Sequence, residues 1–202
     1  MTIYAIVNNI LGEERCSGYD KAIWCVISPS AILQGGNPYF VADFADRIES
    51  RPALALRIGK LGKSIASRFA YRYVDAIAPC SIMLAPDLLK NLKEEGLPWS
   101  QALSYDRSIA IGKFIEYPFS GIPNAKFKIQ LKEEESIKEF EWSASKISPL
   151  AEDTINQISR DNTLKTGDIL IVGISATGPE MRPGQRMSLY LDQKTMLSFN
   201  IR

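Results

Sequence analysis

The sequence predicts an α+β fold in which strands dominate over helices. Most hydrophobic residues fall in short β-branched or alternating segments, which is typical of strands. Only three segments show either helical spacing or helix start and stop residues. Strands and helices do not alternate regularly, as they would in a doubly wound sheet. With 202 residues, of which 46% are hydrophobic, we expect one domain over 1–202, with about 1–45 forming a smaller N-terminal part.

The strands are expected from two kinds of pattern. Continuous apolar segments indicate strands buried on both faces, and alternating segments indicate half-exposed strands. The continuous segments are 3–7, 22–28, 53–58 and 168–175, and the alternating ones are 112–117, 125–131 and 137–143. The charged segment 132–136 is expected to form a hairpin turn. Residues 186–192 and 195–201 are expected to form a closing hairpin through Gln193 and Lys194.

Three helices are expected, at 64–77, 86–95 and 148–159. The first rests on spacing alone, because an i, i+4 series places four residues on one face: Ile65, Phe69, Tyr73 and Ile77. The other two rest on start and stop residues. These residues are Pro86 and Gly96 for the second helix, and Ser148 and Pro149 for the third.

Composition argues against several classes of partner. The net charge is +1, from 24 basic and 23 acidic residues, so we expect neither a nucleic-acid nor an anionic-membrane partner. No apolar segment approaches the ~18–20 residues of a membrane span, and the first residues do not resemble a signal peptide. Three cysteines without a pairing motif fit free thiols. We therefore expect a cytoplasmic protein.

The chain contains no histidine, which limits its chemistry. Histidine is the commonest general base and the usual partner of a serine or cysteine nucleophile. No phosphate-loop, dinucleotide-binding or nucleophile-elbow motif is present either. Any reaction must use carboxylates, lysine, tyrosine, cysteine or a bound cofactor. The segment "GISATG" at 173–178 is compatible with a ligand pocket or with a structural turn.

The order of the segments adds a resemblance to a known family. The series is "RIGKLGKSI" (57–65), "PDLLKNLKEEGLPWSQALSYD" (86–106), "IGKFI" (111–115), "LKTGDILIVGIS" (164–175) and "MRPGQRMSLYLD" (181–192). This series resembles the fumarylacetoacetate hydrolase family, from about residue 22 to the C-terminus. The resemblance implies a mixed β-roll with flanking helices, usually dimeric. It also implies activity on acylpyruvates and related 2-oxo acids with one divalent cation, typically magnesium.

The family's metal-binding and catalytic positions hold other residues in this chain. The resemblance places the Glu-x-Glu metal pair on Arg51 and Ala53, the metal aspartate on Ile82 and the active-site lysine on Leu103. The remaining pocket positions fall on Asn9, Ser175 and Thr177, and the family's histidine is absent. Magnesium takes oxygen ligands, which arginine, alanine and isoleucine side chains do not supply. We therefore expect no metal cofactor and assign no catalytic residue.

Two functional interpretations remain open. The first is a non-catalytic, inactive paralogue with a structural or regulatory role, as a homodimer or as a heteromer with an active paralogue. The alternative is an enzyme or binding protein for small 2-oxo acids, of the hydrolase, decarboxylase, isomerase or hydratase class, with a remodelled pocket around Arg51. There the guanidinium would replace the cation and bind a small carboxylate ligand, unless Arg51 pairs with Asp87 or Asp106 instead.

Four residues near the former site also bear on these interpretations. Glu49 or Asp87 could restore a weak metal site if the register differs from the one that we derive. Cys80 and Tyr105 lie near the former site in the sequence and could be recruited for chemistry, although a buried thiol and a core tyrosine are the more ordinary roles.

Overall fold

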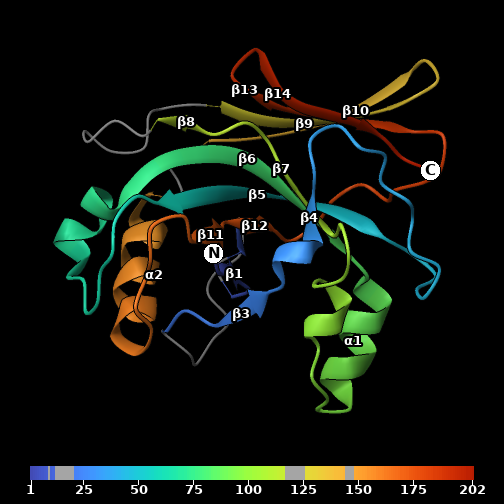
Figure 1. The fold of residues 1–202 in the computed structure, drawn as a ribbon. Helices are drawn as coiled ribbons and strands as arrows, with labels where there is room; N and C mark the ends of the chain where they lie inside the picture. Colours follow the sequence, from blue (N-terminus) through green and yellow to red (C-terminus); the bar gives the residue numbers. More distant parts are fainter. Residues whose placement is uncertain (9, 12–20, 117–125, 144–147) are drawn as a thin grey trace.

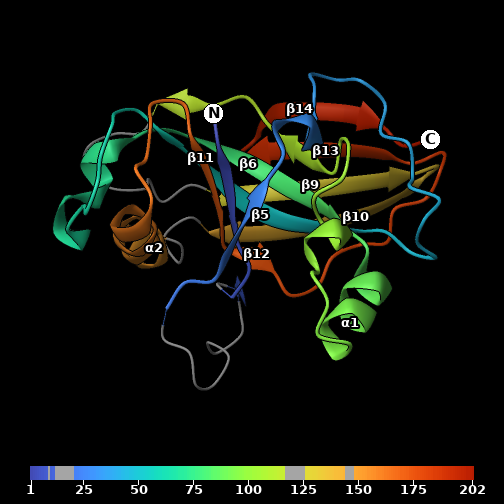
Figure 2. The same ribbon diagram turned by 60° about the horizontal axis from the view of Figure 1, so that its bottom comes forward.

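The computed structural model describes residues 1–8, 10–11, 21–116, 126–143 and 148–202, and Figure 1 shows its fold. The described strands form a large mixed sheet, a four-stranded sheet and a two-stranded ribbon. In Figures 1 and 2 the four-stranded sheet covers one face of the large sheet. Helices α1 (Pro86–Glu94) and α2 (Ser148–Asp161) lie toward opposite ends of the long strands on the other side. This architecture confirms the expected mostly-β fold with flanking helices.

The sheets bring together strands that are distant in the sequence. The large sheet has the order β3-β1-β11-β5-β6-β7-β4, with β8 beside β6, and the four-stranded sheet has the order β10-β9-β13-β14. The large sheet contains β1 Ile3–Ile6, β3 Trp24–Ile27, β4 Ile32–Leu33, β5 Glu49–Ile58, β6 Val74–Leu84, β7 Ile109–Ile111, β8 Ile115–Glu116 and β11 Ile169–Val172. The other strands are β9 Lys126–Glu133, β10 Ser136–Ser143, β13 Arg186–Leu191 and β14 Lys194–Asn200, with β2 Ile10–Leu11 and β12 Ile174–Ser175 in the ribbon. Short 3-10 helices span Pro29–Ala31, Ser67–Tyr73 and Ser100–Ala102.

Strands β5 and β6 form the centre of the large sheet. They pair antiparallel over their whole length, from Glu49 opposite Leu84 to Ile58 opposite Val74. Because side chains alternate along a strand, Leu54, Leu56 and Ile58 face one side of the sheet while Ala53 and Ala55 face the other. All five are at most 1% exposed, so β5 is covered on both faces. This explains why its sequence is continuously apolar rather than alternating.

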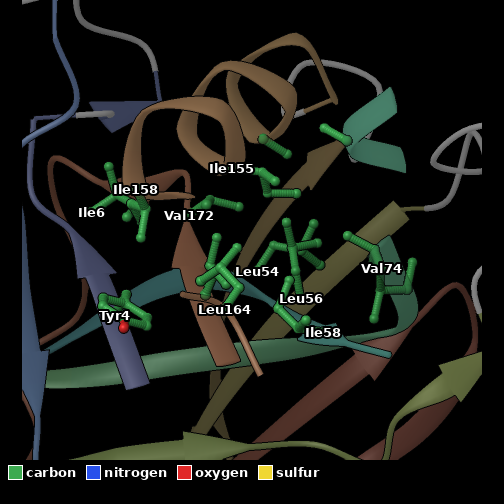
Figure 3. Packing of buried hydrophobic residues seen from close by; sticks show 14 of the residues in the cluster. Tyr4, Ile6, Leu54, Leu56, Ile58, Val74, Ile155, Ile158, Leu164 and Val172 are labelled. Carbon is green, nitrogen blue, oxygen red and sulfur yellow. The ribbon is translucent and has the colours of Figure 1, made fainter. Parts of the chain in front are cut away.

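Helix α2 packs on one of these faces, as Figure 3 shows. Its Ile155 and Ile158 belong to the same buried cluster as Leu54 and Leu56, and Ile158 lies near Ile6 and Val172. Each fully buried isoleucine or leucine contributes about 1.5–3 kcal/mol relative to an exposed one. The predicted helix at 148–159 is therefore confirmed, and it extends to Asp161. The predicted helix at 86–95 is confirmed as α1, which ends at Glu94, two residues before Gly96.

The predicted helix at 64–77 is wrong. Only Ser67–Tyr73 is helical, as a 3-10 segment, and β6 begins at Val74. The i, i+4 series does not form one buried face, because Phe69 is 38% exposed whereas Ile77 is fully buried in the sheet. Pairing of Val74 with Ile58 places this end of the segment in the sheet, and that tertiary pairing overrides the local spacing.

Most predicted strands are confirmed, with three differences. The segment 112–117 contributes only Ile115–Glu116 to a strand within the described residues, and β7 precedes it. The segment 168–175 is divided at Gly173, whose φ of +62° suits glycine, so that Ile174 pairs with β2 instead of continuing β11. The closing hairpin turns at Asp192 and Gln193, one residue earlier than expected. In the described part of the chain, no helix has the length and apolar character needed to cross a membrane.

Candidate functional site

A pocket of about 170 Å³ lies where α1 and the loop after it meet the ends of β5 and β6. Its wall is mainly apolar and comes from several elements: Ile82, Leu84, Leu89, Trp99, Leu103 and Ile174. Arg51 and Lys93 supply the charged groups, and none of the described lining residues is acidic. An apolar pocket with a few charged groups is the usual form of a small-molecule site.

The register of β5 and β6 places several predicted site residues together. Arg51 lies directly opposite Ile82, and Ala53 lies opposite Cys80. Arg51, Ile82 and Leu103 all line the pocket, whereas Ala53 is fully buried in the apolar cluster that includes Ile82 and Leu103. The residues at the positions inferred for the metal pair and the metal aspartate are thus neighbours across two strands.

The segment 173–179 forms another wall by lying against β5. A side chain at Gly178 would place its Cβ 1.6 Å from the carbonyl oxygen of Ser50, so this close approach requires glycine. The Ser50 N–H donates to the carbonyl of Pro179 at 2.9 Å. Ser175 lines the pocket and Thr177 is exposed outside its lining. The segment is therefore both a structural turn and a pocket wall; Asn9 lies outside the described residues.

Arg51 is held at the pocket by a partly buried ion pair. Its Nη2 lies 2.7 Å from Oε2 of Glu49, and the two side chains are only 13% and 12% exposed. Its Nη1 donates a long hydrogen bond of 3.5 Å to the carbonyl of Ser175. Glu49 also pairs with Arg47 at 3.3 Å, and Arg47 pairs with Asp87 at 3.4 Å. Arg51 therefore forms an ion pair with Glu49, whereas Asp87, one of the partners considered for it, pairs with Arg47.

Lys93 is the second charged group of the lining, and our sequence reasoning missed it. It lies four residues after Leu89 on α1, so the two side chains share one face of the helix, and both line the pocket. Its Nζ lies 5.3 Å from the ring centroid of Trp99, another lining residue. The i, i+4 spacing of Leu89 and Lys93 was the signal that could have identified this lysine.

The side chains at the pocket do not fit a magnesium ion. Magnesium takes oxygen ligands in near-octahedral geometry, and carboxylates supply the protein's share of them. The inferred ligand positions hold Arg51, Ala53 and Ile82, and Glu49 is paired with two arginines. The described residues contain no group of three or more His, Cys, Asp or Glu that could hold a metal. We therefore derive no chemistry from a metal at this site.

Neither Cys80 nor Tyr105 lies in the pocket lining. Cys80 is fully buried in β6, and burial raises the pKa of its thiol, so the thiolate is suppressed. The hydroxyl of Tyr105 lies 2.9 Å from that of Tyr39, and burial raises the pKa of both phenols, that of Tyr39 to about 12. Both residues therefore serve the core, which is the more ordinary of the two roles considered for them.

Comparison with known proteins agrees with this fold and also identifies the family to which related proteins belong. The profile of the family described as fumarylacetoacetate (FAA) hydrolase C-terminal matches residues 17–202. A mouse (Mus musculus) protein named oxaloacetate tautomerase FAHD1, mitochondrial, is 24% identical over 191 residues, covering 94% of this chain and 85% of its own length.

Two crystal structures show the same fold. A fumarylacetoacetate hydrolase family protein from Yersinia pestis CO92 superposes with a TM-score of 0.85 at 20% identity, covering 100% of this chain and 93% of that chain. Fumarylpyruvate hydrolase from Pseudomonas aeruginosa, in complex with Mn²⁺ and pyruvate, gives 0.80 at 21% identity, covering 100% and 89%. The resemblance found in the order of the segments is thereby confirmed.

Proposed function

The chain belongs to the fumarylacetoacetate hydrolase family, and from this premise we propose that its pocket binds small 2-oxo acids and catalyses their keto–enol tautomerisation without a divalent cation. The observation that carries the proposal is the position of Arg51. Its guanidinium lines the pocket at a position that the family resemblance assigns to a metal ligand. A positive charge is thus retained beside the pocket, on a side chain instead of an ion.

The first step is recognition of the carboxylate. A guanidinium presents five N–H donors in a planar fork, so it can pair with Glu49 along one edge and with a ligand carboxylate along another. The long contact from Nη1 to the carbonyl of Ser175 is the one that a ligand oxygen would replace. Arg51 is only 13% exposed at its side chain, so solvent screens such a contact weakly.

Size and polarity fit a small 2-oxo acid. An engineered apolar cavity of about 150 Å³ holds benzene, which has six non-hydrogen atoms. The pocket here is about 170 Å³ and continues to the surface, so a ligand of roughly six to nine non-hydrogen atoms fits. Apolar side chains such as Ile82 and Leu103 would contact its carbon chain.

Tautomerisation is the reaction that this lining suits best. The C–H bond beside the carbonyl breaks, its electron pair forms the C=C bond, and the oxygen becomes an enol. Water accepts the carbon's proton and water supplies the proton that the oxygen gains, so the reaction is balanced without another reactant. Arg51 would stabilise the negative charge that develops on the oxygen, an effect worth about 10²–10³ in rate for one donor. Hydrolysis would instead need an activated water, for which the described lining offers no carboxylate.

The relatives support a catalytic role over the non-catalytic one that was our first interpretation. The mouse relative is named for tautomerisation of oxaloacetate, and the structural neighbour from Pseudomonas aeruginosa is named as a hydrolase. The open pocket also favours a ligand. A partner role would remain the better explanation if the purified protein neither bound nor converted any 2-oxo acid and instead formed a heteromer.

The test is an assay of enol–keto conversion of oxaloacetate in the presence of excess chelator. We expect activity that persists in chelator and falls about 10²–10³-fold in Arg51→Met. The matched control is Arg57→Met, since Arg57 lies on the same strand but pairs with Asp75 away from this pocket. Activity that disappears with chelator, or that is equal in both variants, would overturn the proposal.

Product analysis separates this reaction from its nearest competitor. Decarboxylation of the same compound would release carbon dioxide and leave pyruvate, whereas tautomerisation conserves every carbon. Pyruvate formation at the rate of enol loss would therefore replace the isomerase assignment with a decarboxylase one.

A further inference from the structure

Lys93 occupies a defined place on the wall opposite the β-strands. Helix α1 begins at Pro86 and carries Leu89 and Lys93 on one face, and both line the pocket. Arg51, by contrast, comes from β5. The two cations of the lining therefore belong to different elements, with apolar side chains making up most of the wall.

Trp99 keeps the Lys93 ammonium at the pocket. The Nζ atom lies 5.3 Å from the centroid of the indole ring, within the range of a cation–π contact. Trp99 itself is half-buried against the apolar cluster that contains Ile82 and Leu103, so the ring is anchored. Lys90, one turn earlier on the same helix, instead pairs with Glu94 at 3.9 Å and does not line the pocket.

The two cations differ in how much of their charge is balanced. Arg51 shares a partly buried ion pair with Glu49. No salt bridge among the described residues involves Lys93, and none of the described lining residues is acidic. The α1 side of the pocket therefore carries a positive charge for which the described lining supplies no counter-charge, and this favours a second anionic group on the ligand.

We propose that Lys93 is a specificity-determining residue that selects 2-oxo acids carrying a second carboxylate. The inference rests on the proposed function, in which Arg51 binds the carboxylate common to all 2-oxo acids. Lys93 would bind the distal carboxylate, and the apolar wall would contact the short carbon chain between the two. Trp99 positions the Lys93 ammonium through the cation–π contact and does not itself bind the second carboxylate.

The test compares two ligands that differ by one carboxylate, pyruvate and oxaloacetate, in calorimetric titrations of the chelator-treated protein. We expect the wild type to prefer oxaloacetate. Lys93→Met should weaken oxaloacetate binding about tenfold, which corresponds to 1.4 kcal/mol, and change pyruvate binding by less than twofold. Lys93→Arg should keep the preference for oxaloacetate, because the proposal requires only a positive charge at this position.

Lys90→Met is the matched control, since it removes a lysine from the same helix outside the pocket. It should leave both affinities unchanged. Equal weakening of both ligands in Lys93→Met, or no change in either, would overturn the inference. Arg51→Met tests the proposed function separately from the role of Lys93. If this variant binds neither pyruvate nor oxaloacetate, the common carboxylate site at Arg51 is supported. If it binds both as well as the wild type does, that site is refuted.

Discussion

The two arginines of β5 show how one strand supports two different kinds of ion pair. Arg57 forms a two-point pair with Asp75, with Nε–Oδ1 and Nη2–Oδ2 distances of 2.8 and 3.1 Å, and also lies over the ring of Phe114. These side chains are 40% and 43% exposed, against 13% and 12% for Arg51 and Glu49. The pair with better geometry is thus the more solvated, and the pair at the pocket is the more buried.

The degree of burial determines what each arginine can do. A solvated pair gains little free energy, since water and salt screen it. A partly buried guanidinium is costly to leave without a counter-charge, and it interacts strongly with any anion that approaches it. Arg51 therefore has the physical properties expected of a ligand-binding group, whereas Arg57 has those of a surface residue.

The most destabilising change is removal of the carboxylate from the more buried pair. Glu49→Ala leaves the charge of Arg51 in a partly buried site, so the free energy of unfolding should fall by about 3–5 kcal/mol. Asp75→Ala should cost at most about 1 kcal/mol, because Arg57 remains solvated. Urea denaturation of both variants measures the difference. Similar losses in the two variants would mean that burial does not distinguish the pairs.

A smaller effect is expected when the arginines themselves are replaced. Arg51→Met should weaken the binding of oxalate by about 1.5–3 kcal/mol, the usual contribution of a hydrogen bond to a charged group. Arg57→Met should leave it unchanged. The stabilisation of each variant by oxalate in thermal unfolding reports the result. If oxalate failed to stabilise Arg57→Met but still stabilised Arg51→Met, the anion site would lie at the Arg57 end of β5 and not at the pocket.

The smallest effect concerns salt. The Debye length shortens from about 10 Å at 0.1 M to about 3 Å at 1 M ionic strength, and buried pairs are screened less than exposed ones. Raising sodium chloride over this range should therefore reduce the small cost of Asp75→Ala toward zero. The cost of Glu49→Ala should change little. Repeating the urea titrations at both salt concentrations makes the measurement, and equal salt sensitivity would contradict the assignment of burial.

Much of the fold could be predicted from the sequence because the signals are local. The apolar segment of β5 and the Pro86 start of α1 can each be read within a short window, and the order of the family segments adds a signal along the chain. The family positions placed Arg51 and Ile82 at one site, but only the structure shows that they lie directly opposite each other on β5 and β6. The predicted helix at 64–77 failed because its last residues pair with β5, a contact that no local pattern records.

The candidate site could be predicted only in part, for a related reason. Family positions identified the pocket residues on the strands, but Glu49 as the partner of Arg51 depends on side-chain geometry. Lys93 depends on how α1 is placed against Trp99, which is a tertiary contact. The positions assigned by the family resemblance therefore located the strand residues at the pocket more readily than the side chains that contact them.

Our proposal depends on a guanidinium, rather than a divalent cation, holding the ligand. The most direct measurement is calorimetric titration of oxalate into the wild-type protein after exhaustive chelation, and again after addition of excess Mg²⁺. We expect the same dissociation constant under both conditions, and binding weakened by about 1.5–3 kcal/mol under both in Arg51→Met. Binding that occurs only with Mg²⁺, or that has the wild-type affinity in Arg51→Met, would contradict the proposal.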